Sequence, residues 1–508
     1  MNEFSSNNDD SSLEQPAIKS LQSDVPTINK KNESVMDEIM NNGFLTKYPI
    51  LIIICIHFSF LADGVEMTLM TVLIIPMKTY FNLSTFQIQL VAATLFLGVA
   101  LGSFSSGWLS KSVGRIASLK FTLFLLLISH LMMAISLSEG MFICTRIFIG
   151  YSLGVIIPIS LSLYSEFIPI KIRGCLLLMT WFFFFVGYVL NGVIAYCEMP
   201  NLEMSKTKKV LTILTIFPFL SFLVNVIFLT DSPRNLILNN QSDKAFKILK
   251  SINKEREIST EQKQAMISEV MTEANITTSG SIYDLFSKQY LFTTIICILL
   301  FFVNGCAFYG VSIITTLTQQ EITIEEEEVN NKSIIRSQII IAFVTMFSSV
   351  IGGILIEIPF VGRKGVLWIW QLINALLLLP AVYFPKLFTF FMSVSNFACS
   401  LWGNVLITYI VEIYPTMLRD TSSGFLLMIY RLSCLISQFL YLGLFEIHYK
   451  IVYYLSTILL LLGVIATLIL PFESVNKPLD IQYEAEKIRL VENDSILKEN
   501  SNEGKKNI

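Results

Sequence analysis

The chain carries little charge and few of the residues that build metal or catalytic clusters. Asp, Glu, Lys and Arg make up 15% of its 508 residues, against about a quarter in a typical soluble domain. The net charge of −3 gives no electrostatic reason to expect a nucleic-acid partner. The three histidines are far apart in the sequence, so we predict no zinc-binding or catalytic cluster.

Patterned cysteines and nucleotide-binding loops are also missing. The eight cysteines are scattered, mostly inside apolar runs, without the spacing of metal sites or disulfide frameworks, and we interpret them as packing residues. No phosphate-cradling GxxxxGK[ST] loop is present, so ATP-driven pumping is unsupported. An intramembrane enzyme is disfavoured, because neither a nucleophile with a base nor a set of metal ligands is apparent. We expect no cofactor.

Apolar residues are what the sequence has in abundance. They make up 53% of the chain, and phenylalanine alone occurs 39 times. Apolar runs of roughly 17 to 25 residues, the length that a bilayer requires, form two groups of six: residues 49–75, 87–107, 117–137, 141–164, 174–197 and 209–229, then 290–317, 337–357, 366–384, 386–409, 421–443 and 449–471. Pro380 and Pro385 leave an alternative division of the 366–409 region. The sequence predicts an all-α membrane protein with twelve transmembrane helices.

The polar segments define the remaining organisation. Residues 1–48 are rich in Asn, Ser, Asp and Glu and predict a disordered tail without a signal peptide. A bundle over 49–229 and a second over 290–471 are joined by a linker over 230–289, where helices are expected around Ala245–Leu249 and Ala265–Met271. A charged tail follows from 472 to 508.

Two motifs recur between the halves. The segment YSEFIPIKIRG at 164–174 shares its skeleton with YIVEIYPTMLRD at 409–420, and Glu166, Pro169 and Arg173 match Glu412, Pro415 and Arg419 at identical spacing. In a second motif, Gly107, Gly114 and Arg115 match Gly353, Gly362 and Arg363 at offsets of 246 and 248. Two motifs at nearly one offset indicate internal duplication. A parallel repeat of membrane helices is the architecture of a transporter that rocks one half against the other.

Basic residues in the loops predict the orientation. With the N-terminus inside, the outer loops hold about half as many Lys and Arg as the inner loops, although Lys206, Lys208 and Lys209 are an exception. Both termini should therefore be cytosolic. The sequons at Asn82 and Asn331 would then face outward and the one at Asn275 inward. We expect a monomer in the lipid bilayer of the plasma membrane or of an intracellular vesicle.

Four loop segments carry a resemblance to a known family. GWLSKSVGR follows the second span, SEFIPIKIRG the fourth, DSPRNLILNNQSDKAFKIL the sixth and VEIYPTMLRD the tenth. Together they resemble the major facilitator superfamily, whose fold is two parallel six-helix repeats. Within it the chain is similar to the branch of sugar porters, organic ion transporters and synaptic vesicle 2-related proteins. ADGVEMTLM in the first span and NGCAFYGVSIITT in the seventh favour the last group.

The resemblance implies that these loop motifs gate the cytosolic side. Glu166 and Arg173 would pair with one another or across the halves, and Pro169 would fix the chain reversal. The glycines of the inner turns would allow close backbone approach. The chain departs from the family pattern at Lys111, where an acid is usual, and Glu357 lies five residues before Gly362 instead of three. We therefore predict a resting state biased toward the inward-open form.

Ionisable residues inside the spans are the candidates for substrate chemistry, because burying them in hydrocarbon is costly. Asp63 and Glu66 lie three residues apart on one helix face, which suggests proton coupling or cation binding. Arg146 and Arg431 could neutralise an acid or receive an anionic solute. The alternative is that these acids and arginines pair structurally and titrate nothing. Hydrogen bonds and aromatic walls could come from Asn304, Tyr309, Trp402 and Asn404.

These observations favour a secondary active transporter of a small organic solute, with protons as the candidate coupling ion. Organic ions, sugars and carboxylates all remain open as substrates. The alternative function is a transporter-shaped receptor or scaffold that does not turn over.

Overall fold

The computed structural model describes residues 35–470 apart from 81–82, 137, 169–172, 200–203, 254–256, 277–280, 326–330, 357, 359–361 and 415. The regular structure of these residues is helical. Twelve of the described helical segments are long and apolar enough to cross a membrane: residues 47–78, 85–110, 115–134, 139–167, 176–198, 206–228, 291–323, 332–355, 362–383, 385–410, 421–447 and 449–469. Each overlaps one predicted run, so the twelve-span all-α prediction is confirmed.

The first six spans form the N-terminal half. Two of them are interrupted: the first consists of two helices in series, and so does the sixth. The helices are α3 (Lys47–Thr68), α4 (Met70–Tyr80), α5 (Thr85–Val113), α6 (Arg115–Ala134), α7 (Glu139–Phe167), α8 (Arg173–Glu198), α9 (Met204–Leu214) and α10 (Ile216–Phe228). Ser84 and Gln87 form a capping box at the start of α5, which satisfies backbone donors that a helix N-terminus leaves open.

The last six spans form the C-terminal half. Its helices are α14 (Leu291–Gly305), η3 (Cys306–Gly310), α15 (Val311–Glu325), α16 (Asn331–Met346), α17 (Ser348–Leu355), α18 (Gly362–Tyr383), η4 (Pro385–Leu387), α19 (Phe388–Ile413), α20 (Thr416–Ile447) and α21 (Tyr449–Ile469). The seventh span is interrupted at η3, where the backbone forms a π-helical turn. Such turns are frequent at functional sites, and this one contains Tyr309.

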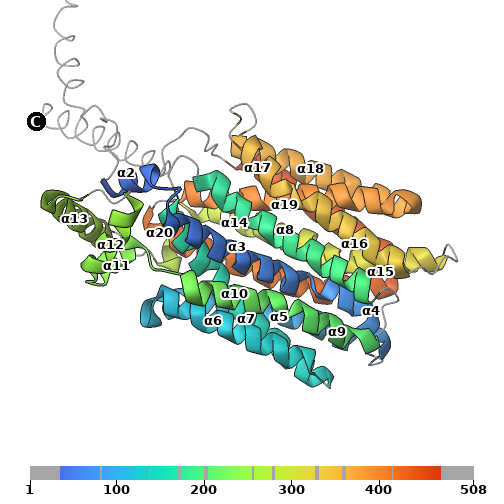
Figure 1. The fold of residues 1–508 in the computed structure, drawn as a ribbon. Helices are drawn as coiled ribbons and strands as arrows, with labels where there is room; N and C mark the ends of the chain where they lie inside the picture. Colours follow the sequence, from blue (N-terminus) through green and yellow to red (C-terminus); the bar gives the residue numbers. More distant parts are fainter. Residues whose placement is uncertain are drawn as a thin grey trace, which may run out of the picture.

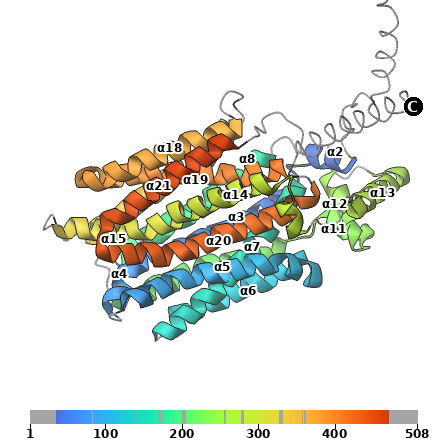
Figure 2. The ribbon, with the colours of Figure 1, turned by 180° about the vertical axis from the view of Figure 1, so that it is seen from behind.

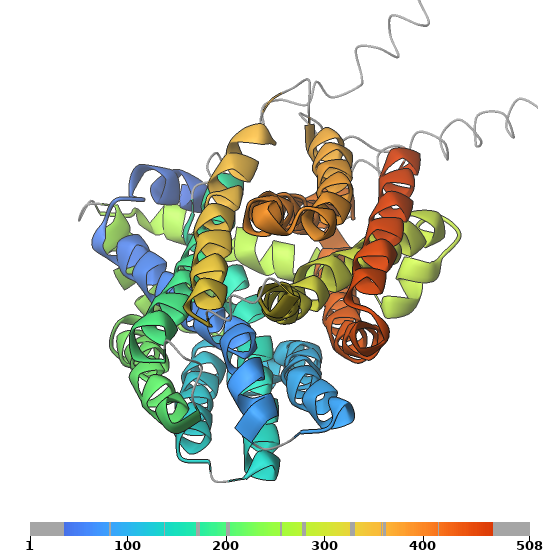
Figure 3. The same ribbon diagram turned by 90° about the vertical axis from the view of Figure 1, so that its right-hand side faces the viewer.

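The two halves lie side by side. Figure 3 shows the blue-to-green helices of the N-terminal half on one side and the yellow-to-red helices of the C-terminal half on the other. Across the boundary, α5 packs against α20 and α8 packs against α16 and α17; α5 and α20 are neighbours in Figure 2. The second and eleventh spans thus face each other, as do the fifth and eighth, as expected for two related repeats.

Glycines permit the closest helix packing of the N-terminal half. Cβ atoms at Gly98 or Gly102 of α5 would come closer than 3.0 Å to backbone atoms of α7, and Cβ atoms at Gly150 or Gly154 of α7 would do the same to α5. This is the small-xxx-small pattern of membrane helices. We call this close contact between α5 and α7 the α5–α7 seam. It holds the two helices together in the wall of the site described below.

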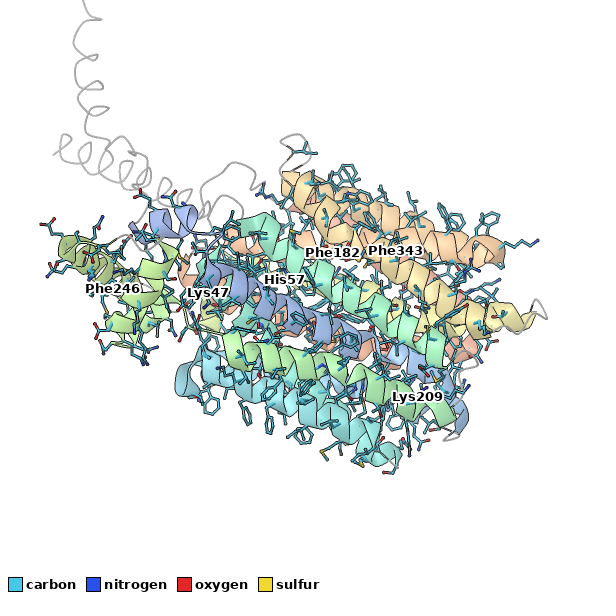
Figure 4. All side chains as sticks on the ribbon, in the orientation of Figure 1. Lys47, His57, Phe182, Lys209, Phe246 and Phe343 are labelled. Atoms are coloured by element: carbon cyan, nitrogen blue, oxygen red, sulfur yellow. The ribbon has the colours of Figure 1, made fainter. Side chains whose placement is uncertain are left out.

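The linker helices gather at one end of the bundle (Figure 1): α11 (Pro233–Leu238), α12 (Ser242–Ile252), α13 (Thr260–Ile276) and the short η2 (Ile282–Phe286). Both segments for which the sequence predicted linker helices are helical. We call this end, where Lys47 and Phe246 lie in Figure 4, the linker end, and the opposite end, near Lys209, the far end.

The N-terminal tail differs from the prediction. Residues 1–34 and the C-terminal tail at 472–508 lie outside the described residues. Within the segment expected to be disordered, however, Val35–Asn42 forms helix α2 and packs on α12 and α13. Met36, Ile39 and Met40 are buried. Their apolar face, spaced at helical intervals, is the physical reason for the difference.

Candidate functional site

A cavity of about 80 Å³ lies between the two halves. Its N-terminal wall comes from the linker-side parts of α5, α7 and α8 and is largely apolar and aromatic, including Trp181, Phe184 and Phe185. Its C-terminal wall comes from α14, η3, α19 and α20 and carries the polar groups Asn304, Asn404 and Arg431. The site therefore has one aromatic wall and one hydrogen-bonding wall, each supplied by a different half.

The polar wall offers donors that are not engaged. Asn304 Nδ2, Asn404 Nδ2 and Arg431 Nη1 are buried without a hydrogen-bond partner in the described part of the chain. Gly403 makes room for the first of these, because a Cβ there would come closer than 3.0 Å to Asn304 Nδ2. Leaving buried donors unpaired is costly, so the wall is suited to a solute that presents oxygen acceptors.

Arg431 lies among aromatic rings. Its guanidinium is 5.0 Å from the ring centre of Tyr430 and 6.0 Å from that of Tyr309, within the range of cation–π attraction. Tyr309 comes from the π-helical turn η3 and also stacks edge-on against Phe96 of the other half, 5.0 Å between ring centres. The sequence also predicted Trp402 as a site residue, along with Asn304, Tyr309 and Asn404. Trp402 is fully buried next to Gly403 but does not line the cavity.

Asp63 is the acid that faces Arg431. It lies on α3 in the middle of the first span and is 1% exposed. Neither carboxylate oxygen accepts a hydrogen bond from the described residues. Arg431 of the opposite half and Glu66 of its own helix act on it electrostatically. Opposite charges thus face each other across the boundary that a rocking motion would open.

Glu66 has a different environment from Asp63. Its Oε1 is paired with His130 Nδ1 of α6, and both side chains are fully buried. Arg146 Nη1 of α7 donates to the backbone oxygen of Glu66 at 3.4 Å. The sequence placed Asp63 and Glu66 on one face with a shared role; the structure engages them with different partners.

His130 is the functional candidate that the sequence analysis missed. It was read as isolated because its partner lies 64 positions away in the chain. The available signal was a histidine in the middle of an apolar run, since ionisable residues in membrane spans generally have a partner.

The far end is closed by contacts between the halves. Thr316 Oγ1 donates to Thr71 O at 3.0 Å, Tyr188 OH donates to Gln338 Oε1 at 3.0 Å, and Gln89 Nε2 donates to Phe439 O at 3.0 Å. The cavity residues, by contrast, lie in the middle or linker-side parts of their membrane spans.

The predicted gate residues at the linker end are only partly paired as expected. Glu166 forms an ion pair with Arg115 of α6, where the sequence suggested Arg173 or a partner in the other half. The turn after α5 brings Arg115 to the end of α7. Arg363 Nη1 donates to Ile356 O at 3.0 Å. Pro169, Glu357 and Pro415 lie outside the described residues, as do the side chains of Lys111, Arg173, Glu412 and Arg419.

The gate glycines act through backbone conformation more than through close approach. Gly114 has φ 96° and Gly362 has φ 62°, values that favour glycine. A Cβ at Gly107 would meet no atom within 4 Å. The prediction of close backbone approach at this glycine is therefore wrong. Gly353 lies buried in α17.

Asp231 adds a half-buried acid beside the Arg115–Glu166 pair. Its carboxylate accepts hydrogen bonds from Ser232 N at 2.9 Å and Asn235 Nδ2 at 2.7 Å. Burial raises the pKa of Asp231, and these two hydrogen bonds oppose the shift. Arg115 and Glu166 also act on its charge, so the three groups form one electrostatic cluster.

Comparisons with known proteins agree with the fold described above. A sequence model of the Sugar (and other) transporter family matches residues 18–485. The chain is 25% identical over 439 residues to the synaptic vesicle 2-related protein of Xenopus laevis, covering 83% of this chain and 78% of that protein. It is 24% identical over 495 residues to organic cation/carnitine transporter 7 of Arabidopsis thaliana, covering 89% and 97%. The xylose transporter XylE from E. coli, in a partially occluded inward open conformation, has the same fold, with a TM-score of 0.69 at 16% identity over 84% of this chain and all of that one.

Proposed function

The chain belongs to the Sugar (and other) transporter family, and on that premise we propose that it moves a small organic solute by alternating access, coupled to protons through Asp63. It is a non-enzymatic integral membrane protein of the major facilitator fold. The observation that carries the proposal is the cavity between the halves, with unpaired donors on one wall and aromatic rings on the other.

The donors favour one class of solute. Asn304, Asn404 and Arg431 supply amide and guanidinium N–H groups, which recognise hydroxyl, carbonyl or carboxylate oxygens. Trp181 and Phe184 supply an apolar surface opposite them. An oxygen-rich solute with an apolar face, such as an organic carboxylate or a sugar, therefore suits the cavity better than a bare organic cation.

Asp63 and Arg431 supply a means of coupling. When Asp63 is ionised, its charge offsets that of Arg431; when it is protonated, the guanidinium is available to an acceptor on the solute. Binding of a proton and of the solute would then favour each other. For a solute carboxylate, the cost of burying unpaired charge favours the doubly empty and the doubly loaded forms as those in which the halves change between inward-open and outward-open states.

The arrangement supports an inward-facing state. The far end is closed by hydrogen bonds between the halves, and the cavity residues lie toward the linker end. If the basic loops place the linker and both termini in the cytosol, this state opens inward, in line with the bias expected from Lys111.

Uptake into proteoliposomes tests the function. Purified protein would be reconstituted and offered radiolabelled sugars, carboxylates and organic cations, with and without an inward proton gradient. We expect uptake of an oxygen-acceptor solute that the gradient increases. If no solute in the panel is taken up while a solute still binds the purified protein, the non-transporting receptor becomes the better description.

A further inference from the structure

The buried Glu66–His130 pair fixes the position of a proton. His130 Nε2 lies 3.0 Å from the backbone oxygen of Leu211. Because a carbonyl oxygen only accepts, Nε2 must carry a hydrogen. The other ring nitrogen, Nδ1, is paired with Glu66 Oε1. Two lone pairs repel each other at hydrogen-bonding range, so this contact holds one further proton between them and must lengthen when that proton leaves.

This second proton is the one that can leave. With it, the pair is neutral overall, either as imidazolium with carboxylate or as imidazole with carboxylic acid. Without it, the imidazole is neutral, Glu66 is ionised, and the pair carries one negative charge. Both side chains are fully buried and Glu66 Oε2 has no partner in the described residues, so the protein does not compensate the carboxylate by further hydrogen bonds.

Three charged side chains surround the pair. Arg146 faces the pair from α7 and Asp63 lies one turn away on α3, while α9 contributes the Leu211 carbonyl. Across the boundary, Arg431 acts on Asp63. With the proton bound, these five side chains sum to one positive charge when Asp63 is ionised; after its release they sum to zero. The cost of an uncompensated buried charge thus favours release, while the close His130–Glu66 contact favours retention.

Arg146, the neighbour of the pair, lines a small cavity at the boundary between the halves. A second, smaller cavity of about 10 Å³ is lined by Arg146, Thr68 and Tyr188 of the N-terminal half and by Tyr309 and Ser312 of the other. This is about the space that one water needs. Tyr309 also lines the central cavity. Because both halves form these walls, access to Arg146, which contacts the backbone of Glu66, changes when the halves move.

We propose that Glu66 and His130 form a second proton-binding site, separate from Asp63, that exchanges its proton with the boundary between the halves beside Arg146. The inference rests on the proposed proton-coupled function for its role in transport. The site itself is tested by proton binding alone.

Nitrogen NMR of the full-length protein in lipid nanodiscs measures this proton directly. His57→Phe and His448→Asn leave His130 as the sole histidine. Phenylalanine preserves the ring contact of His57 with Phe183, and asparagine can keep the N-cap that His448 provides to α21. The ¹⁵N-histidine spectrum would then be recorded from about pH 5 to about pH 9.5, a range that spans ordinary histidine titration.

We expect Nε2 to stay protonated throughout and Nδ1 to lose its proton within this range. Glu66→Gln should leave Nδ1 unprotonated down to at least about pH 6, because the carboxylate that holds the proton is gone. Arg146→Gln should increase the proton affinity about tenfold or more, since the charge that favours release is removed. Variants are compared only where they elute as single species in size-exclusion chromatography.

A Nδ1 signal that stays protonated at every pH and ignores Arg146→Gln would overturn the proposal, because the pair would then be a permanent structural contact. A Nδ1 that is unprotonated at every pH would overturn it too. If Glu66→Gln does not fold, the titration of the His130-only protein still decides. Loss of uptake with an intact Nδ1 titration would count against the proposed transport function while supporting this proton site.

Discussion

Replacing Gly150 with alanine should destabilise the N-terminal half. The added methyl group would lie closer than 3.0 Å to the backbone oxygen of Leu95 on α5, where ordinary contacts begin at 3.4 Å. Backbone atoms cannot swing aside as the end of a long side chain can, so α5 and α7 must separate. Overpacking of this kind costs about 1–3 kcal/mol, which corresponds to a fall of roughly 2–12 °C in the melting midpoint for a unit of this size.

The same helix offers a matched control. A Cβ at Gly140 of α7 would meet no atom within 4 Å, so Gly140→Ala should leave the midpoint unchanged or slightly raised, as expected from the helix propensity of alanine. Both variants would be purified in detergent and melted with fluorescence-detected size-exclusion chromatography as readout. Equal midpoints for Gly150→Ala and Gly140→Ala would refute the proposed seam.

Three further predictions concern the gate and the site. Lys111→Asp should shift the resting population toward the form that is open at the far end, because an acid complements the positive N-terminal end of a helix better than a lysine does. Labelling of single cysteines in the two vestibules would measure this shift. Unchanged labelling would mean that Lys111 has no role in gating. Arg431→Lys should weaken solute binding about tenfold or more by losing the planar fork, whereas the exposed Arg336→Lys should not; equal affinities would return Arg431 to structural pairing. Burial raises the pKa of Asp231 above its ordinary 3.8, so its ionisation costs stability as the pH rises from about 3.8 through the folded-state pKa. Asp231→Asn should therefore have a flatter profile of thermal stability against pH, and a profile that parallels the wild type would contradict this.

The architecture was predictable because each span is a long apolar run whose length is set by the bilayer. The division after Tyr383 was less certain, because Pro380 lies inside α18 without ending it. Helix α2 was missed, since the surrounding polar residues hid the short apolar face formed by Met36, Ile39 and Met40.

The site was predictable in composition but not in pairing. An acid or arginine within an apolar run can be recognised from the sequence alone. The structure buries all four such residues named there, Asp63, Glu66, Arg146 and Arg431. Which acid meets which base depends on how helices far apart in sequence pack together. The sequence therefore could not assign His130 to Glu66.

The most direct test of the account is accumulation of a transported carboxylate or sugar in proteoliposomes under an imposed proton gradient, with wild type compared with Asp63→Asn. The exposed Glu257→Gln serves as the control, since Glu257 is 92% exposed. We predict that wild type and Glu257→Gln accumulate the solute above its external concentration, whereas Asp63→Asn only equilibrates or exchanges it. Full gradient-driven accumulation by Asp63→Asn would contradict the coupling of transport to this carboxylate.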